Sequence, residues 1–207
     1  TYGLQAAEAG CLGVCWTNTT PNLPPWGAKE PKLGNNPIVF AIPREDGHHI
    51  LLDMALSVFS YGKIESYARC HQELPVDGGF DQHGQLTKDP MTINETMLPL
   101  PIGFWKGSGL SLVLDLLAVI LSGGKSTYQV GQLETEKEIS QVFIAIDFNQ
   151  LPDRESVMAA IDQTLQDLHN AQPWQVGNDI TYPGENMFKR RMENLQLGIP
   201  VEETYWQ

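Results

Sequence analysis

The segment Trp105-Lys106-Gly107-Ser108-Gly109 combines residue types that can bind an anion. It runs into Leu110–Leu121, which is apolar on almost every side and therefore predicts a buried helix. The first turn of a helix carries backbone N–H groups without intrahelical partners, and glycine leaves them accessible. With the Lys106 ammonium beside them, they could bind a phosphate or a carboxylate. The alternative is that Ser108 only caps a core helix.

Two aspartates lie where a carboxylate is informative. Asp53 ends a hydrophobic strand, where it could accept a hydrogen bond from a sugar or ribose hydroxyl, or only begin a turn or cap the next helix. Asp115 lies inside the apolar run and must be paired or neutral if it is buried. A structural partner, such as a backbone group or a lysine, is favoured over a catalytic role for Asp115.

The histidines and cysteines form no recognisable catalytic or metal-binding pattern. No histidine has a carboxylate at a spacing that suggests a proton relay, so each is interpreted as solvated: His48, His49, His71, His83 and His169. Three cysteines, Cys11, Cys15 and Cys70, are too few for a disulfide framework, and no matching pair accompanies them for a metal site. A reducing cytoplasm suits this cysteine usage best.

Composition restricts the class of protein and its partners. The chain has 207 residues, 42% of them hydrophobic and 18% charged, which is typical of a soluble domain with a small appendage. A net charge of -12 argues against nucleic acid and anionic membranes as partners. The run Leu110–Leu121 is also short for a membrane span. We expect an α/β domain over residues 1–178 and a C-terminal loop and helix over 179–207.

Helices and strands alternate along the chain, which predicts an α/β fold. We expect helices over residues 2–9, 57–68, 109–121, 154–170 and 185–195, and strands over 11–17, 38–42, 50–54 and 140–148. The short turn-rich connector at 43–48 indicates a hairpin, so the sheet should be mixed and not purely parallel. No G-x-G-x-x-G motif follows a strand, which argues against a Rossmann fold.

Several long motifs resemble the second malate/L-lactate dehydrogenase family. They occur in order along the chain, over Gly10–Asn18, Pro24–Glu30, Gly34–Pro37, Leu52–Ala55, Leu74–Asp81, Gly84–Pro90, Gly103–Gly109 and Pro183–Glu185. The resemblance covers the chain from Thr1 to about Gln207. It implies a nicotinamide-dependent oxidoreductase with a non-Rossmann cofactor fold, without a metal, and usually a homodimer.

The same resemblance implies which residues contact the nicotinamide cofactor. They are His49, Ile50, Leu51, Leu52, Asp53, Met54, Ala55, Trp105, Lys106, Gly184 and Glu185. Asp53 is the only carboxylate in the 49–55 strand, which contains no arginine, so NADH is expected rather than NADPH. Arg44 and Lys63 lie outside the strand and remain free, at this stage, to fold back toward it.

A finer resemblance, over Pro24–Glu30, Phe59–Gly62 and Leu74–Asp81, implies reduction of a ketone of a 2,3-diketo sugar acid. Malate, lactate, sulfolactate or a cyclic imine are the alternative substrates within the family. The family's general acid is a histidine in a Ser-His-Gly motif on an N-terminal helical segment, and this chain has no such motif, so its catalytic acid is unknown. We therefore expect the 207 residues alone to be nearly inactive, and an inactive nucleotide-binding module is the alternative from another class.

Overall fold

The computed structural model describes residues 1–175 and 177–201 in two compact units. Unit 1 contains Thr1–Val14, Val39–Leu52 and the chain from Ile144 onward, and unit 2 contains Cys15–Ile38 and Asp53–Phe143. Each unit is described by itself. Of the expected appendage over 179–207, residues 202–207 lie outside the described residues, and its separation as a domain stays a prediction.

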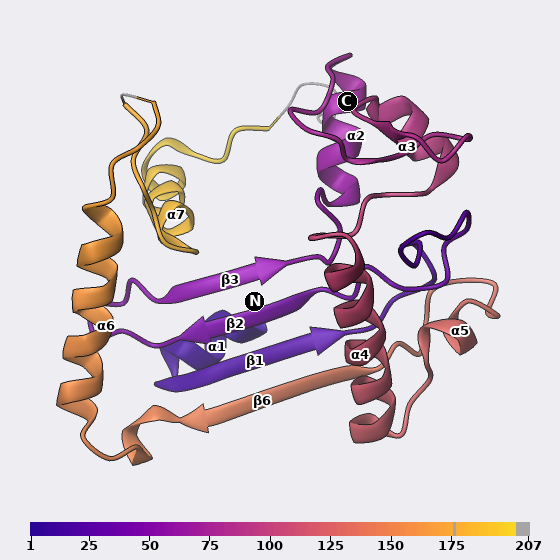
Figure 1. Ribbon diagram of the computed structural model, residues 1–207. Helices are drawn as coiled ribbons and strands as arrows, with labels where there is room; N and C mark the ends of the chain where they lie inside the picture. Colours follow the sequence, from indigo (N-terminus) through magenta and orange to yellow (C-terminus); the bar gives the residue numbers. More distant parts are fainter. Residues whose placement is uncertain (176, 202–207) are drawn as a thin grey trace. The chain divides into compact units, whose positions relative to one another are not determined.

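Four strands form the main sheet, at nearly the residues that the sequence predicts. They are β1 (Cys11–Thr17), β2 (Ile38–Ile42), β3 (Ile50–Met54) and β6 (Gln141–Asp147), paired in the order β3-β2-β1-β6. Neighbouring arrows point in opposite directions (Figure 1), so each pair among these four strands is antiparallel. The parallel pair that the expected mixed sheet requires is not found among them. The α/β class and the hairpin between β2 and β3 are confirmed.

Unit 1 also contains the first and the last helices of the described residues. These elements are α1 (Tyr2–Glu8), a 3-10 turn at Phe148–Gln150, α6 (Arg154–His169) and α7 (Glu185–Leu197). Gly3 allows α1 to approach the sheet closely, because a Cβ there would lie 2.6 Å from Val39 Cγ1. The helix boundaries match the sequence prediction within two residues.

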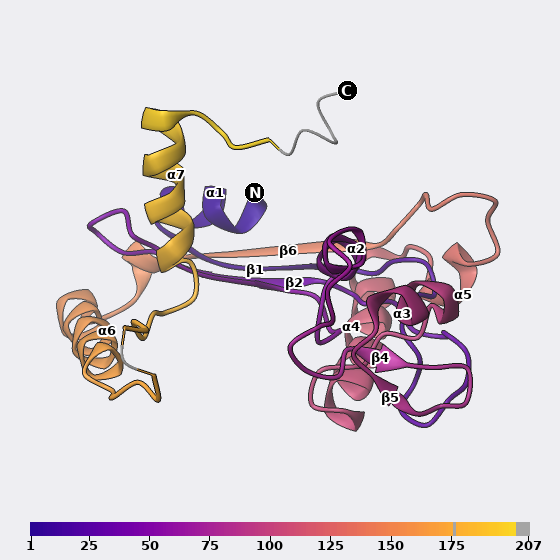
Figure 2. The ribbon, with the colours of Figure 1, turned by 90° about the horizontal axis from the view of Figure 1, so that it is seen from above.

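Unit 2 holds a small α/β subassembly that the sequence shows only in part. Its elements are α2 (Tyr61–Arg69), β4 (Gly79–Phe80), β5 (Leu86–Thr87), α3 (Pro90–Thr96) and α5 (Thr127–Val130). Figure 2 shows α2, α3 and the β4–β5 hairpin side by side, around a core of Ile64, Leu74 and Ile93. The expected start of α2 at Ser57 is wrong, because the Ser60 side chain caps the helix by accepting from the Lys63 N–H.

Helix α4 (Trp105–Ser122) differs from its prediction in both start and burial. It begins four residues before Gly109, and its buried stripe is small and polar: Gly107, Ser108, Ser111, Leu114, Asp115 and Ala118. Apart from Leu114, its large apolar side chains lie outside this stripe, with Ile120 74% exposed. By length and hydropathy, α4 is the one helix of the described residues that could cross a membrane. Core helices of soluble proteins also meet this criterion, and the buried stripe of α4 packs within unit 2.

Asp115 has structural partners, as the sequence favours: one is a backbone N–H, and the other is a distant side-chain amide instead of a lysine. Its Oδ1 accepts from the Asn18 Nδ2 at 2.7 Å and from the Thr127 N–H at 2.8 Å. Asn18 is fully buried, and its Oδ1 accepts from the Ser140 N–H at 2.7 Å while Nδ2 also donates to the Lys125 carbonyl. This network joins β1, α4 and the segment before β6 within unit 2.

Candidate cofactor site

The turn that leads into α4 is closed by hydrogen bonds within the chain. The Gly107 N–H donates to the Ile102 carbonyl at 2.8 Å, and the Lys106 N–H donates to the Gly103 carbonyl at 3.2 Å. The expectation that these N–H groups are free to bind an anion is therefore wrong. The Ser108 cap is also wrong, because the helix begins at Trp105 and the Ser108 hydroxyl accepts from the Trp26 N–H. The exposed Lys106 side chain remains as a cationic donor for an anion at this turn.

Within unit 2, the structure brings Asp53–Ala55 close to this turn along the backbone. Strand β3 ends at Met54, and two residues later the Leu56 carbonyl accepts from the Ile102 N–H at 3.0 Å. Ser57 and Pro101 form an antiparallel bridge beside it. Two segments that are about fifty residues apart in the chain are thus joined directly before Trp105 and Lys106.

The side chains at this junction remain available to a ligand. Asp53, Trp105 and Lys106 are all exposed, and the Trp105 ring is 65% accessible. Among the described residues, neither the Asp53 carboxylate nor the Lys106 ammonium has an ion-pair partner within 4.0 Å. An exposed aromatic ring, a cation and a carboxylate therefore belong to one part of unit 2.

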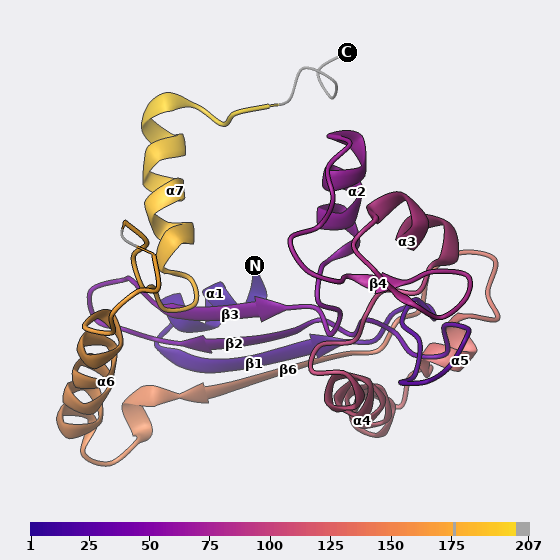
Figure 3. The ribbon, with the colours of Figure 1, turned by 45° about the horizontal axis from the view of Figure 1, so that its top comes forward.

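A second group of expected residues meets in unit 1, where α7 begins beside the start of β3 (Figure 3). The Leu51 N–H donates to the Pro183 carbonyl at 2.9 Å. Gly184 has a φ of +95°, and a Cβ there would lie 2.9 Å from the Leu51 nitrogen and 3.3 Å from the His49 carbonyl. Only glycine suits both this backbone conformation and this contact. The structure thus places Pro183 and Gly184 against His49 and Leu51. Their contact with a cofactor stays a prediction.

Glu185 is held by an interaction that the sequence analysis missed. Its Oε2 accepts from the His169 Nε2 at 3.0 Å, and its Oε1 lies 3.2 Å from the Lys189 ammonium. Partial burial raises the pKa of Glu185, but hydrogen bonds from His169, Lys189 and the Tyr182 N–H outweigh it and lower the pKa below the usual value. The solvated interpretation of His169 is therefore incomplete. Sixteen residues separate the pair, so no local spacing reveals it.

The lowered pKa of Glu185 predicts how stability depends on pH. A carboxylate whose pKa is lowered by folding stabilises the folded state above its unfolded pKa, near 4.5, and this contribution is lost as the pH falls through the folded value. Glu185→Gln should therefore flatten the loss of unfolding free energy between about pH 5 and pH 3. Urea unfolding at several pH values measures this. Glu193→Gln, in the same helix, is the control, and parallel curves for the unchanged protein and Glu185→Gln would contradict the assignment.

His49 is buried, which corrects its interpretation as a solvated turn residue. Burial lowers its pKa, and nearby Arg44 and His48 act in the same direction. Its Nδ1 accepts from the Arg44 backbone N–H at 3.0 Å, so the neutral ring carries its hydrogen on Nε2. The imidazole at this position is therefore a neutral hydrogen-bond donor.

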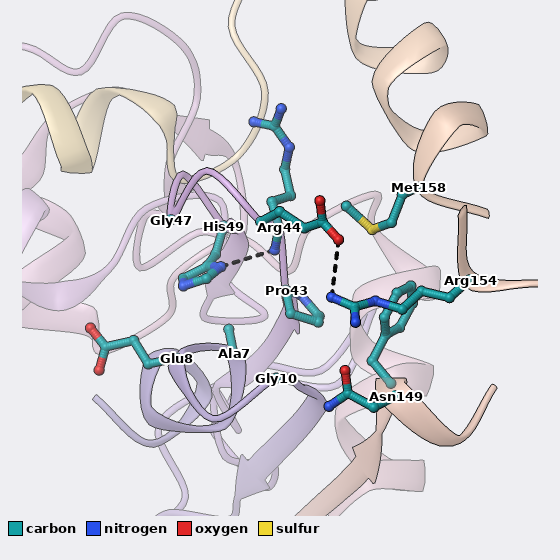
Figure 4. Close-up of a pocket in the computed structure, with 12 residues that line it drawn as sticks. Ala7, Glu8, Gly10, Pro43, Arg44, Gly47, His49, Asn149, Arg154 and Met158 are labelled. Atoms are coloured by element: carbon teal, nitrogen blue, oxygen red, sulfur yellow. Dashed lines mark hydrogen bonds and ion pairs between the residues drawn. The ribbon is translucent and has the colours of Figure 1, made fainter. Parts of the chain in front are cut away.

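His49 lines a cavity of about 320 Å³ in unit 1 (Figure 4). The wall contains the donors Asn149 and Arg154 and the acceptors Glu8 and Glu45, with Arg154 and Glu45 paired at 3.1 Å. Arg44 also lines the cavity, so two guanidinium groups accompany the two carboxylates and the wall has no excess of positive charge for an anion. Over residues 1–175 and 177–201, no group of three or more metal-ligating side chains is found.

Comparison with known families supplies the context for these two groups of residues. A model of the malate/L-lactate dehydrogenase family matches residues 1–207. The chain belongs to this family. It is 42% identical over 207 residues to the 2,3-diketo-L-gulonate reductases of Salmonella paratyphi A (strain ATCC 9150 / SARB42) and Salmonella newport (strain SL254). The match covers 100% of this chain and 62% of each relative, so the chain spans about three fifths of their length.

Several solved structures have the same fold as this chain. The sulfolactate dehydrogenase from Methanocaldococcus jannaschii is 29% identical with a TM-score of 0.82, over 98% of this chain and 58% of that one. The delta1-piperideine-2-carboxylate reductase from Pseudomonas syringae is 27% identical with a TM-score of 0.78, over 97% and 59%. Malate dehydrogenase from Entamoeba histolytica, at 22% identity and a TM-score of 0.89, over 98% and 60%, supports the fold alone. The expected non-Rossmann α/β fold and the oxidoreductase family are therefore confirmed.

Proposed function

We propose that the protein is an NADH-dependent reductase of a 2,3-diketo sugar acid, of the 2,3-diketo-L-gulonate type. The proposed cofactor contacts are His49–Ala55, Trp105, Lys106, Gly184 and Glu185. The observation that carries the proposal is the junction in unit 2, where Asp53, Trp105 and Lys106 offer an exposed carboxylate, an exposed aromatic ring and an exposed cation. Within the part of the chain that the structure describes, neither charged group is ion-paired. Similarity to the Salmonella reductases supports the choice of substrate.

These side chains fit the chemistry of a nicotinamide dinucleotide. The Lys106 ammonium can bind a diphosphate oxygen, the Asp53 carboxylate can accept from a ribose hydroxyl, and the Trp105 ring can stack on a heterocycle. Gly184 keeps the backbone beside Leu51 free of a side chain. Bound NADH would supply the hydride, and the residues of this chain bind and orient it.

Lys106→Ala tests the cofactor assignment. We expect the Kd for NADH to rise about tenfold, because a charge-assisted hydrogen bond contributes about 1.5 kcal/mol. The kcat at saturating NADH should change little, since Lys106 is proposed to act in binding. Isothermal titration of the intact protein measures the Kd. Lys137→Ala, an exposed lysine elsewhere in unit 2, is the control. An unchanged Kd for Lys106→Ala would overturn the assignment.

NADH should be preferred to NADPH because Asp53 would repel a 2′-phosphate. Arg44 and Lys63, which the sequence left free to approach Asp53, contact other side chains in the described structure. The Arg44 guanidinium is paired with Asp46 at 3.0 Å and Asp162 at 3.1 Å, and the Lys63 ammonium lies 5.1 Å from the centre of the Tyr67 ring. We therefore expect kcat/KM to be at least about tenfold higher with NADH, a difference of about 1.4 kcal/mol in transition-state stabilisation.

A matched pair of variants separates the local effect of Asp53 from net charge. Asp53→Asn should lower the ratio of kcat/KM with NADH to kcat/KM with NADPH. Glu65→Gln removes one negative charge from an exposed position of α2 and should leave this ratio unchanged. The measurement is kcat/KM for both cofactors with one ketone substrate. A ratio near one for the unchanged protein would show that Asp53 does not face the ribose.

The substrate and the assembly complete the proposal. Turnover with 2,3-diketo-L-gulonate, compared with malate, lactate, sulfolactate and a cyclic imine, distinguishes the proposed substrate from those of other family members.

A homodimer in the cytoplasm is the proposed state, consistent with three free cysteines. The proton donor to the nascent alkoxide is not assigned to a residue of this chain. Low turnover by the 207 residues alone is therefore part of the proposal.

A further inference from the structure

The two residues before α4 have backbone conformations that favour glycine. Gly103 has a φ of +56°, and Phe104, which precedes the first helical residue, has a φ of +61° and a ψ of -114°. A side chain at such angles is strained, and strain of this kind concentrates at ligand-binding sites, where the surrounding structure enforces it. At Phe104, the chain therefore keeps a bulky ring where glycine would be easier to accommodate.

The enforcing contacts come from Trp26 in the long loop between β1 and β2. The Trp26 and Phe104 ring centres are 5.1 Å apart, and the Phe80 ring centre is 6.2 Å from that of Trp26. These three rings form an aromatic cluster. The Trp26 backbone is fixed to the same helix, since its N–H donates to the buried Ser108 hydroxyl at 3.0 Å. Trp26 thus contacts α4 through both its ring and its backbone.

Core packing does not explain this cluster well. Trp26 is 47% exposed and Phe104 is 48% exposed, so neither ring is buried as a core aromatic residue would be. Phe104 is the residue at which the chain enters α4. The next two residues are Trp105 and Lys106, whose side chains are exposed.

We propose that Trp26 is a positioning residue for the cofactor site. Its ring holds Phe104 in the strained turn, and this turn directs the Trp105 ring and the Lys106 ammonium toward the cofactor. The inference rests on the proposed function, because it takes Trp105 and Lys106 as cofactor contacts. It adds a residue from a loop that the expected cofactor segments do not include.

The first experiment measures the Kd for NADH and the kcat at saturating NADH in the intact protein. Trp26→Ala should raise the Kd at least fivefold with kcat within twofold, and Trp26→Phe should restore most of the affinity. Trp174→Ala is the matched control, because Trp174 is fully exposed in unit 1. An unchanged Kd for Trp26→Ala, or a Kd for Trp26→Phe as high as that for Trp26→Ala, would overturn the proposal.

A second pair of variants separates the ring of Phe104 from its backbone. Phe104→Gly removes the ring and relieves the strain, whereas Phe104→Ala removes the ring and keeps the strain. If the ring contact positions the site, both variants should bind NADH at least fivefold more weakly. Wild-type affinity for NADH in Phe104→Gly would show that the turn forms without the contact to Trp26, and would overturn the inference. This comparison does not require that Trp26→Ala folds.

Lys106→Ala, measured in parallel, separates the two proposals. If Lys106→Ala weakens binding and Trp26→Ala does not, only the positioning role fails. If Lys106→Ala binds NADH as tightly as the unchanged protein, the proposed cofactor site fails, and the positioning role fails with it.

Discussion

Replacing Asn18 by alanine should lower the free energy of unfolding by about 3–4 kcal/mol. The Asn18 amide makes buried hydrogen bonds to the Asp115 carboxylate, the Lys125 carbonyl and the Ser140 N–H, all of 2.7 Å. Alanine would leave each of these groups with one partner fewer, and the bonds to Asp115 and Ser140 are buried. The penalty is largest at the carboxylate, because a buried charge depends most on its hydrogen bonds.

Urea denaturation gives the unfolding free energy for this comparison. Asn170→Ala is the control, since Asn170 is exposed at the end of α6 and its replacement should change stability by less than about 0.5 kcal/mol. A similar small change for Asn18→Ala would mean that the Asp115 network contributes little to stability.

The elements that the sequence predicts best are those whose signals are local. The apolar run of β1 sets the strand at Cys11–Thr17, and Gly10 ends the helix before it with a φ of +76°. α3 was missed although its signals are also local. Asp89 accepts from the Met91 N–H at 3.0 Å and Pro90 occupies the first turn, but seven residues with little apolar periodicity are easily taken for a loop.

The site features that escape prediction depend on contacts between distant segments. Asn18 and Asp115 are 97 residues apart, and His169 and Glu185 are 16 apart, so neither pair produces a sequence pattern. The start of α4 was misplaced for a similar reason. The helix begins at Trp105 because the preceding turn is closed by Ile102 and Gly103 carbonyls, and the positive φ of Phe104 cannot be inferred from its residue type. The cofactor segments themselves came from the family resemblance.

Gly107→Ala should lower the free energy of unfolding by about 2–3 kcal/mol and weaken NADH binding together with it. A Cβ on Gly107 would lie 2.3 Å from the Ile102 carbonyl oxygen and 2.8 Å from the Ile102 nitrogen. Both atoms belong to backbone, so a side-chain rotation cannot relieve the overlap. The Gly107–Ile102 hydrogen bond must lengthen, and the turn that carries Trp105 and Lys106 must move with it.

Gly109→Ala, two residues further along α4, should have the opposite effect on stability. A Cβ on Gly109 meets no atom within 4 Å, so the variant gains helix propensity without a clash and should raise the unfolding free energy by up to about 1 kcal/mol. Urea denaturation and NADH titration of both variants in the intact protein test the pair. Equal stability of Gly107→Ala and Gly109→Ala would show that the close approach of Ile102 to α4 does not constrain the turn. Loss of stability in Gly107→Ala with unchanged NADH affinity would contradict the expected dependence of cofactor binding on this turn.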